Sequence, residues 1–255
     1  MVNDIELARQ LFSCIDNTTL NATDSERSVE AFCCKTKELK IASGQSSMNV
    51  ASVCVYPRFV SVAANTLKGS GIKVVSVAGD FPHGQASLAV KVQEVKEAVS
   101  DGADEIDIVL NRGLLLSGDV DGAANEIRQM KTACQGRLLK VILETCELGS
   151  ADMIAEASRV VIEAGADFIK TSTGKGAGGA TPEAAEIMLK VIKDYLKKTK
   201  KTVGFKVAGG IRKADEALDY ALLAKKIMGE KYIVPQTFRI GASSLTESLY
   251  SLLTI

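Results

Sequence analysis

Histidine is nearly absent from this chain of 255 residues, which contains only one, His83. Catalytic zinc sites usually hold the metal through two or three imidazoles, so a metal-dependent enzyme is not expected and we assign no metal ligands. A Ser-His-Asp triad would have to use His83, and no G-x-S-x-G motif accompanies it. His83 lies in residues 81–84 (FPHG), a turn-like segment after an apolar run. We therefore predict a structural role for His83, and the chemistry must rest on other residues.

The sequence also lacks net charge and a recognisable targeting signal. Lys plus Arg and Asp plus Glu number 31 each, which argues against a nucleic-acid-binding protein with a basic face. Residues 1–12 carry charges where a signal peptide needs an apolar run, and no stretch approaches the length of a membrane span. The six cysteines form no C-x-x-C pair, and a chain of this size needs no disulfides. We expect a reduced, cytoplasmic protein without nucleic-acid or membrane partners.

Short runs rich in β-branched residues alternate with stretches of helical periodicity along the whole chain. The candidate strands are residues 14–19, 51–56, 73–78, 105–110, 138–144, 168–172, 202–208 and 237–241. Helical periodicity covers residues 86–100, 119–134, 152–164 and 182–198. Residues 23–26 (TDSE) have the pattern of a capping box, and Thr181 before Pro182 has the pattern of a helix start.

Alternating strands and helices predict parallel strands joined by helical crossovers. Eight such units in about 250 residues favour an α/β protein with a closed (β/α)₈ (TIM) barrel. A doubly wound open sheet is the alternative arrangement of the same units. The pattern breaks nowhere for a linker, so we predict one domain over residues 1–255.

Two segments of similar form place a carboxylate near an amine. Residues 102–107 (GADEID) and 165–170 (GADFIK) each begin at the glycine that ends a helix and run into a strand. Asp107 and Lys170 therefore lie at the same depth in the fourth and sixth strands. Alternate strands of a barrel supply one interior layer. We predict that Asp107 and Lys170 lie close together inside the barrel.

Lysine stands in the middle of two strands that should be buried, as Lys170 and Lys206. Lysine is rarely buried without a partner, and burial lowers its pKa. A structural ion pair with Asp107 is one interpretation, but two lysines against one carboxylate leave a surplus buried positive charge. That surplus disfavours protonation, so Lys170 can be a neutral amine that attacks a carbonyl. Lys73 and Lys140 lie at strand starts, where we expect solvent to be near.

Glycine-rich segments follow the sixth, seventh and eighth strands. They are residues 173–176 (TGKG), 208–212 (AGGIR) and 241–244 (GASS). Each offers backbone N–H groups where a helix starts, which is a natural receptor for an anion. Barrel enzymes often bind phosphate with the loops after strands seven and eight. The sequence therefore predicts a phosphate site beside Lys170.

A dinucleotide-binding fingerprint is a competing interpretation of the first of these loops. Residues 174–179 (GKGAGG) match G-x-G-x-x-G between a strand and a helix, with Asp194 at about the right distance. The motif comes sixth of eight units instead of opening the sheet, and a strand lysine precedes it. We therefore favour the phosphate site.

Several segments together resemble the deoxyribose-phosphate aldolase family. Residues 168–174 (FIKTSTG), 204–210 (GFKVAGG) and 241–244 (GASS) are similar to its signatures. Residues 53–57 (VCVYP), 81–84 (FPHG) and 104–107 (DEID) fit the same family in the same order. The resemblance runs from Ile15 and Asp16 to Ser244, which is nearly the whole chain.

The resemblance implies a class I aldolase on a TIM barrel, which reversibly cleaves 2-deoxy-D-ribose 5-phosphate to D-glyceraldehyde 3-phosphate and acetaldehyde without a metal or cofactor. It makes Lys170 the Schiff-base nucleophile, Lys206 the group that lowers its pKa and assists proton transfer, and Asp107 a proton relay through water. The implied substrate-binding residues are Asp16, Cys54, Thr173, Gly174, Lys175, Gly209, Gly210, Arg212, Gly241, Ser243 and Ser244. It also implies small-molecule partners, a phosphosugar and an aldehyde, and a homodimer.

The sequence departs from the family at two places. Val207 stands where some members have proline, which we expect to be benign. Some members end in a mobile tail with a terminal tyrosine that serves in proton transfer, whereas this sequence ends at Thr254 and Ile255. The route of enamine protonation is therefore open. Two other hypotheses remain: a related Schiff-base aldolase or transaldolase acting on another phosphorylated sugar, and a barrel that has lost catalysis and only binds phosphosugars.

Overall fold

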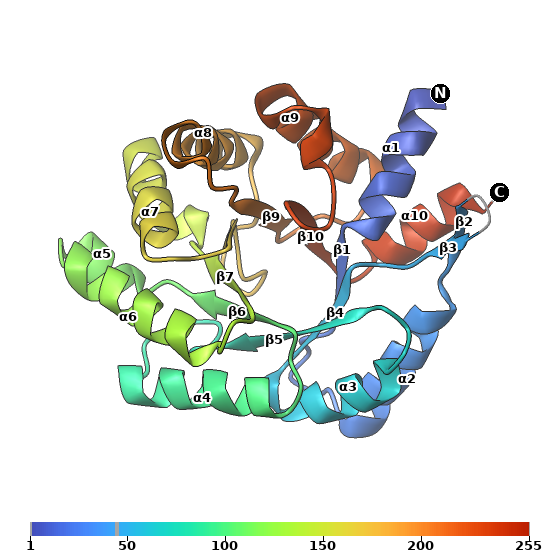
Figure 1. The fold of residues 1–255 in the computed structure, drawn as a ribbon, viewed down its shortest axis with the longest axis horizontal. Coiled ribbons are helices and arrows are strands. Elements are labelled where there is room, and N and C mark those ends of the chain that lie inside the picture. Colours follow the sequence, from blue (N-terminus) through green and yellow to red (C-terminus); the bar gives the residue numbers. More distant parts are fainter. Residues whose placement is uncertain (1, 44–45, 255) are drawn as a thin grey trace.

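The computed structural model describes residues 2–43 and 46–254, in which eight parallel strands close into a barrel surrounded by helices (Figure 1). The order around the barrel is β1-β10-β9-β8-β7-β6-β5-β4, so the first strand lies between the last strand and β4. This closed order confirms the predicted (β/α)₈ barrel. The open doubly wound sheet is wrong, because such a sheet has two unpaired edges.

The eight predicted strands are all present. They are β1 (Ile15–Thr18), β4 (Ser52–Val55), β5 (Lys73–Ala78), β6 (Glu105–Val109), β7 (Leu138–Ile142), β8 (Phe168–Lys170), β9 (Gly204–Ala208) and β10 (Phe238–Ala242). Seven lie within their predicted ranges, and β10 continues one residue further. Outside the barrel, β2 (Ile41–Ser43) and β3 (Ser46–Met48) form a small antiparallel pair that the sequence analysis did not predict.

The helices lie on the outside of the barrel (Figure 1). They are α1 (Val2–Ser13), α2 (Glu26–Glu38), α3 (Val60–Leu67), α4 (Leu88–Ser100), α5 (Arg112–Leu116), α6 (Val120–Ala133), α7 (Ala151–Glu163), α8 (Pro182–Thr199), α9 (Ala214–Met228) and α10 (Leu245–Leu253), with short 3₁₀ turns η1 (Pro57–Phe59), η2 (Thr145–Glu147) and η3 (Glu230–Tyr232). None of the helices in the described part of the chain is both long and apolar enough to cross a membrane.

The helix starts are predicted well in one case and wrongly in the other. Thr181 caps α8 as expected, because its side chain accepts a hydrogen bond from the backbone N–H of Ala184. The capping box at residues 23–26 is wrong. The N-cap of α2 is Ser25, which pairs reciprocally with Ser28. Asp24 instead accepts hydrogen bonds from the Thr19 hydroxyl and the Asn21 backbone N–H, which hold the turn before the helix.

The N-terminal end of the barrel interior is plugged by an aromatic ring. A Cβ on Gly204 would lie 2.2 Å from the ring of Phe168, so only glycine leaves room for that side chain. The Arg239 guanidinium lies 5.8 Å from the centre of the same ring, within range of a cation–π contact. This packing closes the N-terminal end of the barrel interior, and the open end lies at the C-terminal ends of the strands.

Candidate active site

The barrel interior holds seven charged residues, none more than 4% exposed. Four are cationic and three anionic, and we call them the barrel charge cluster: Asp16, Glu105, Asp107, Lys140, Lys170, Lys206 and Arg239. Barrel interiors are ordinarily packed with branched apolar side chains. Burying so many charges is a poor way to gain stability, which points to a role in chemistry.

Asp107 on β6 lies at the centre of the cluster and accepts hydrogen bonds from three ammonium groups. Its Oδ2 lies 2.9 Å from Nζ of Lys170 and 2.8 Å from Nζ of Lys206. Its Oδ1 lies 2.9 Å from Nζ of Lys140. The predicted proximity of Asp107 and Lys170 is confirmed, and Lys206 shares the same carboxylate oxygen.

The sequence analysis placed two lysines near solvent at strand starts, Lys73 on β5 and Lys140 on β7. Lys73, the first residue of β5, is exposed as expected, and its Nζ lies 3.6 Å from Oδ1 of Asp104. The prediction that Lys140 lies near solvent is wrong, because its side chain is fully buried. Lys140 stands opposite Asp107 in the register of β6 and β7, and its Nζ also lies 2.6 Å from Glu105. Position near a strand start does not imply exposure when the side chain points into the barrel.

The deeper part of the cluster contains two residues that the sequence analysis missed, Glu105 and Arg239. Arg239 on β10 donates to both oxygens of Glu105, at 2.7 and 3.2 Å, and to Oδ1 of Asp16 at 2.5 Å. Asp16 also accepts a hydrogen bond from Ser52 and lies 2.5 Å from Nζ of Lys206. The signal was available, because both missed residues are charged side chains inside apolar strands.

The three lysines of the cluster differ in how many carboxylates surround them. Burial alone lowers the pKa of all three. For Lys140 and Lys206 the carboxylates reverse this effect, so that the pKa of each lies above its ordinary value. For Lys170, burial together with the nearby Lys206 charge outweighs Asp107 and lowers the pKa. Lys170 is therefore the amine that loses its proton most readily. Burial raises the pKa of the neighbouring Cys54 thiol to about 11, so this group is neutral.

A cavity of about 230 Å³ opens above Lys170 at the C-terminal ends of β8, β9 and β10. Nine of the predicted site residues line it: Lys170, Thr173, Gly174, Lys175, Gly209, Gly210, Arg212, Gly241 and Ser243. The end of β1 and the loop after it line another side of the cavity through Thr18, Leu20 and Asn21, which we did not predict. The cavity thus joins a buried amine at its floor to glycine-rich loops at its rim.

The other predicted site residues do not line this cavity. Asp16, Cys54, Asp107 and Lys206 are fully buried in the barrel beneath it. Ser244 is exposed and occupies the N-cap position of α10, next to Ser243. The predicted set is therefore divided into a buried group that contacts or neighbours Lys170 and an accessible group at the rim.

The glycines of the rim allow two loops to touch through their backbones. Gly209 has a φ of +93° and packs against Gly179, where a Cβ would lie 2.4 Å from the Gly209 carbonyl oxygen. Ala180 donates a backbone hydrogen bond to that oxygen. The loop after β8 therefore rests directly on the loop after β9, and side chains at these positions would separate them.

Glu144, two residues after the end of β7, fixes the shape of the loop that follows β8. It has a left-handed backbone (φ +53°) that is unusual for a residue with a side chain, and its carboxylate is buried. That carboxylate accepts hydrogen bonds from both the backbone N–H and the hydroxyl of Thr173. The Thr173 hydroxyl in turn accepts from the backbone N–H of Lys175. Thr173 thus uses its donors on Glu144, which suits a residue that shapes the loop.

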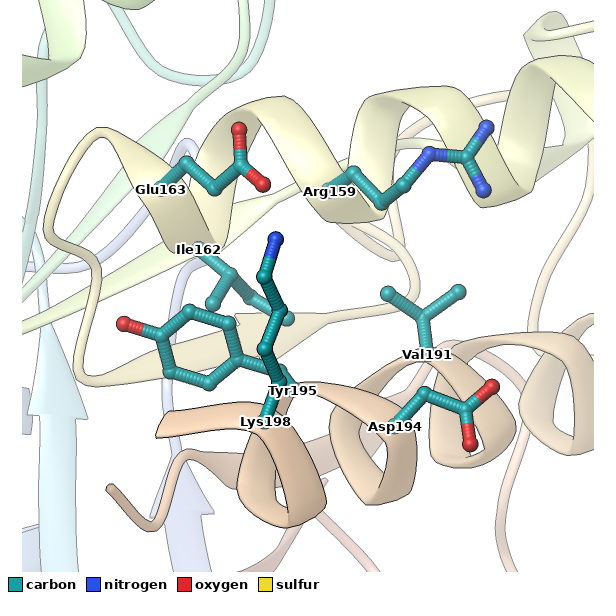
Figure 2. Close-up of a pocket in the computed structure, with 7 residues that line it drawn as sticks. All are labelled: Arg159, Ile162, Glu163, Val191, Asp194, Tyr195 and Lys198. Carbon is teal, nitrogen blue, oxygen red and sulfur yellow. The ribbon is translucent and has the colours of Figure 1, made fainter. Parts of the chain in front are cut away.

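A second hollow, of about 180 Å³, lies on the outer surface between α7 and α8 (Figure 2). Ile162, Val191 and Tyr195 form its apolar part, and charged side chains including Asp194 stand at its edge. Its residues come from the later turns of both helices, which lie at the opposite end of the barrel from the C-terminal ends of the strands. The dinucleotide interpretation needs Asp194 near the loop at residues 174–179, and this placement and the closed barrel make it wrong.

Residues that could bind a metal do not cluster in the described part of the chain, since no group of three or more His, Cys, Asp or Glu side chains has suitable geometry.

A family model described as DeoC/LacD family aldolase matches residues 12–248. The chain belongs to this family of aldolases. The resemblance in the sequence motifs is thereby confirmed, and the protein is an aldolase.

Several proteins named as aldolases are similar to this chain along most of its length. The human deoxyribose-phosphate aldolase is 43% identical over 244 residues, which cover 92% of this chain and 77% of the human protein. A solved structure named QR15, an aldolase, is 33% identical with a TM-score of 0.75 over 94% of this chain and 96% of that one. A tetrameric deoxyribose phosphate aldolase from Aeropyrum pernix is 25% identical with a TM-score of 0.74, covering 99% and 98%.

Proposed function

We propose that this aldolase reversibly cleaves 2-deoxy-D-ribose 5-phosphate to D-glyceraldehyde 3-phosphate and acetaldehyde through a Schiff base on Lys170. The observation that carries the proposal is the position of Lys170. Among the described residues of the barrel charge cluster, it alone lines the cavity, and its Nζ contacts a single carboxylate. The names of the relatives that cover most of this chain support the choice of substrate.

The cavity suits a phosphorylated sugar bound end to end. The phosphate would lie against the backbone N–H groups of Gly174, Gly210 and Ser243, with the cationic side chains of Lys175 and Arg212 at the rim. The open-chain aldehyde carbon would then reach Lys170 at the floor. Binding energy from the phosphate holds the reacting carbon beside the amine, which favours the chemical step.

The reaction proceeds through a covalent intermediate. The neutral Lys170 amine attacks the C1 aldehyde, and loss of water gives a protonated imine. Removal of the proton from the C3 hydroxyl breaks the C2–C3 bond, and its electron pair moves into the imine to form an enamine. Glyceraldehyde 3-phosphate leaves. Protonation of the enamine at C2 and hydrolysis of the resulting imine release acetaldehyde and restore Lys170.

Asp107 and Lys206 are placed to move the protons for these steps. Lys206 and Lys170 hydrogen-bond to the same Oδ2 atom of Asp107, so a proton on one amine is one carboxylate away from the other. Lys206 stays charged because Asp107 and Asp16 raise its pKa, so it also disfavours protonation of Lys170. We assign Lys206 the roles of electrostatic activator and acid, and Asp107 the role of relay through bound water.

The decisive test is trapping of the intermediate. The protein is incubated with acetaldehyde and borohydride, digested, and mapped by mass spectrometry. We expect one ethyl group on the peptide that contains Lys170. Labelling of another lysine instead, or none, would contradict the mechanism. A coupled assay with deoxyribose 5-phosphate and with other aldose and ketose phosphates then tests the substrate.

Lys175→Met tests the phosphate site. In the free protein the Lys175 ammonium donates to the backbone carbonyl of Leu20 across the mouth of the cavity at 2.5 Å, so it is already held at the rim. Loss of one phosphate contact should raise KM for deoxyribose 5-phosphate roughly tenfold with a smaller effect on kcat. Steady-state kinetics give both constants. Unphosphorylated 2-deoxyribose is the control substrate, and an equal loss with it would exclude a phosphate role for Lys175.

We also propose that the chain is one catalytic domain that works in the cytoplasm as a homodimer. Strand β1 pairs with β10, so both ends of the barrel sequence are needed for one closed sheet. The six cysteines are free thiols, which suits a reducing compartment. The relative from Aeropyrum pernix is described as tetrameric, which supports self-association. Light scattering after gel filtration measures the assembly.

A further inference from the structure

We propose that Arg239 is a positioning residue of the catalytic site: its permanent charge gives the barrel charge cluster one cation too many, and this excess makes Lys170 release its proton. The inference rests on the proposed role of Lys170 as the Schiff-base nucleophile. Arg239 does not contact Lys170. It acts through the two carboxylates with which it forms ion pairs, those of Asp16 and Glu105, and so it is not a catalytic residue.

The contacts of Arg239 place its charge firmly inside the cluster. The side chain is 5% exposed and donates to Asp16 and to both oxygens of Glu105. Guanidinium does not lose its proton in proteins. Asp16 passes the effect on, because its other oxygen lies 2.5 Å from Nζ of Lys206, which shares Asp107 with Lys170. A continuous row of contacts therefore connects Arg239 to the reacting amine.

Charge counting explains why one lysine must be neutral. With every group ionised, four cations face three anions in a water-excluded interior. An unbalanced buried charge is strongly unfavourable, and loss of one proton restores balance. Without Arg239, three lysines would balance three carboxylates, and no lysine would need to deprotonate. The arginine, on this argument, turns a balanced set of ion pairs into a site with one free amine.

The geometry selects Lys170 as the lysine that gives up its proton. Lys140 approaches three carboxylates, Glu105 at 2.6 Å, Asp107 at 2.9 Å and Asp16 at 3.8 Å. Lys206 approaches two, and Lys170 approaches Asp107 alone, at an oxygen that it shares with Lys206. Deprotonation of Lys170 therefore breaks fewer ion pairs than deprotonation of Lys140 or Lys206.

The remaining titratable groups around Lys170 do not change this count. The Cys54 thiol on β4 is neutral at physiological pH, because burial raises its pKa. Glu144 follows β7 and is held by Thr173, outside the barrel charge cluster. Lys175 and Arg212 are exposed at the rim, where water screens them. The test below leaves all of these groups in place.

The test is the pH dependence of imine formation at Lys170 in variants that alter the count. Each protein is mixed with a low concentration of acetaldehyde and cyanoborohydride between pH 5 and pH 10, and the rate of ethylation at Lys170 is followed by mass spectrometry. Acetaldehyde has no phosphate to titrate, so the acid limb of this profile reports the free amine. Circular dichroism and urea unfolding confirm that each variant is folded.

Removing the charge of Arg239 and removing the charge of its partner Glu105 should shift the acid limb of the ethylation rate in opposite directions. Arg239→Met should move the acid limb to higher pH by about one unit or more, with about tenfold slower ethylation at pH 7 and recovery at high pH. Glu105→Gln should move it to lower pH, because it adds a second excess positive charge. The double variant restores an excess of one and should lie near the wild type, as should Arg239→Lys. Arg159→Met removes an exposed arginine on α7 and should leave the limb in place.

The outcomes separate this inference from the proposed function. If wild-type Lys170 is not ethylated at any pH, the proposed function fails. If it is ethylated but Arg239→Met and Glu105→Gln shift the limb in the same direction, or neither shifts it, the charge-counting role of Arg239 is wrong. Merely structural damage would lower the rate in both variants without opposite shifts. Should Arg239→Met not fold, the downward shift of Glu105→Gln and its reversal in the double variant decide the question.

Discussion

Lys170→Met will lower the rate of aldol cleavage by roughly 10⁴-fold or more, because the reaction loses the amine that forms its covalent intermediate. The free energy of unfolding of the same variant should stay within about 1 kcal/mol of the wild type, because methionine fills a similar volume and replaces an amine that contacts only one carboxylate. Kinetics with deoxyribose 5-phosphate and urea unfolding measure the two effects. A large loss of activity without a loss of stability is the mark of a residue kept for chemistry.

Lys140→Met is the matched control, since it removes a buried ammonium from the adjacent strand β7. Lys140 contacts three carboxylates, whereas Lys170 contacts one, so Lys140→Met should lower the free energy of unfolding by about 3 kcal/mol. Equal destabilisation by the two substitutions would show that Lys170 is an ordinary ion-pair partner. Activity above one hundredth of the wild type in Lys170→Met would reject it as the nucleophile.

Asp107→Asn is expected to damage both stability and activity. The carboxylate accepts hydrogen bonds from Lys140, Lys170 and Lys206, and an amide leaves these ammonium groups without their shared counter-ion. We expect the free energy of unfolding at pH 7 to fall by about 3–5 kcal/mol. The rate of cleavage should fall by roughly 10²- to 10⁴-fold, the range for loss of a proton-transfer group. Urea unfolding and steady-state kinetics measure these losses.

The pH dependence of the free energy of unfolding is a second test of the stabilising role of the Asp107 carboxylate. Burial alone would raise its pKa, but Lys140, Lys170 and Lys206 hold the pKa well below its ordinary value. Because the folded pKa is depressed, the carboxylate contributes its full stability above the unfolded pKa of about 3.9 and loses it as the pH falls toward the folded pKa. Asp107→Asn should therefore lose less stability than the wild type between neutral and acidic pH. An equal decrease in the free energy of unfolding of the two proteins between neutral and acidic pH would contradict the depressed pKa of Asp107.

The strands and the three residues at the centre of the site could be predicted because they depend on local pattern. β-branched runs separated by helical periodicity fix the number of units, and eight units favour a closed barrel. The equal spacing of Asp107 and Lys170 from the glycine before each strand places them at one depth. Lys206 stood out by the same reasoning, as a charge inside an apolar run. The glycine-rich loops after the last three strands followed from the strand order.

The lower half of the cluster could not be predicted with the rule that we applied. Lys140 was placed near solvent because it lies close to the start of its strand, yet the direction of the side chain decides burial in a barrel. Arg239 and Glu105 lie 134 residues apart in the sequence, and only closure of β10 onto β1 and the tilt of the strands bring their charges together. Pairing across the interior depends on the whole sheet and not on any one segment.

The pairing of β1 with β10 also has a consequence for synthesis of the chain on the ribosome. Asp16 emerges early, but its partner Arg239 lies 223 residues later in the sequence. Until β10 appears, the nascent sheet has an open edge at β1, and its inward-facing carboxylates and lysines are incompletely matched. The barrel can therefore close only after β10 has emerged, and a ribosome that stalls before β10 would leave a charged, unclosed sheet for the cell to degrade.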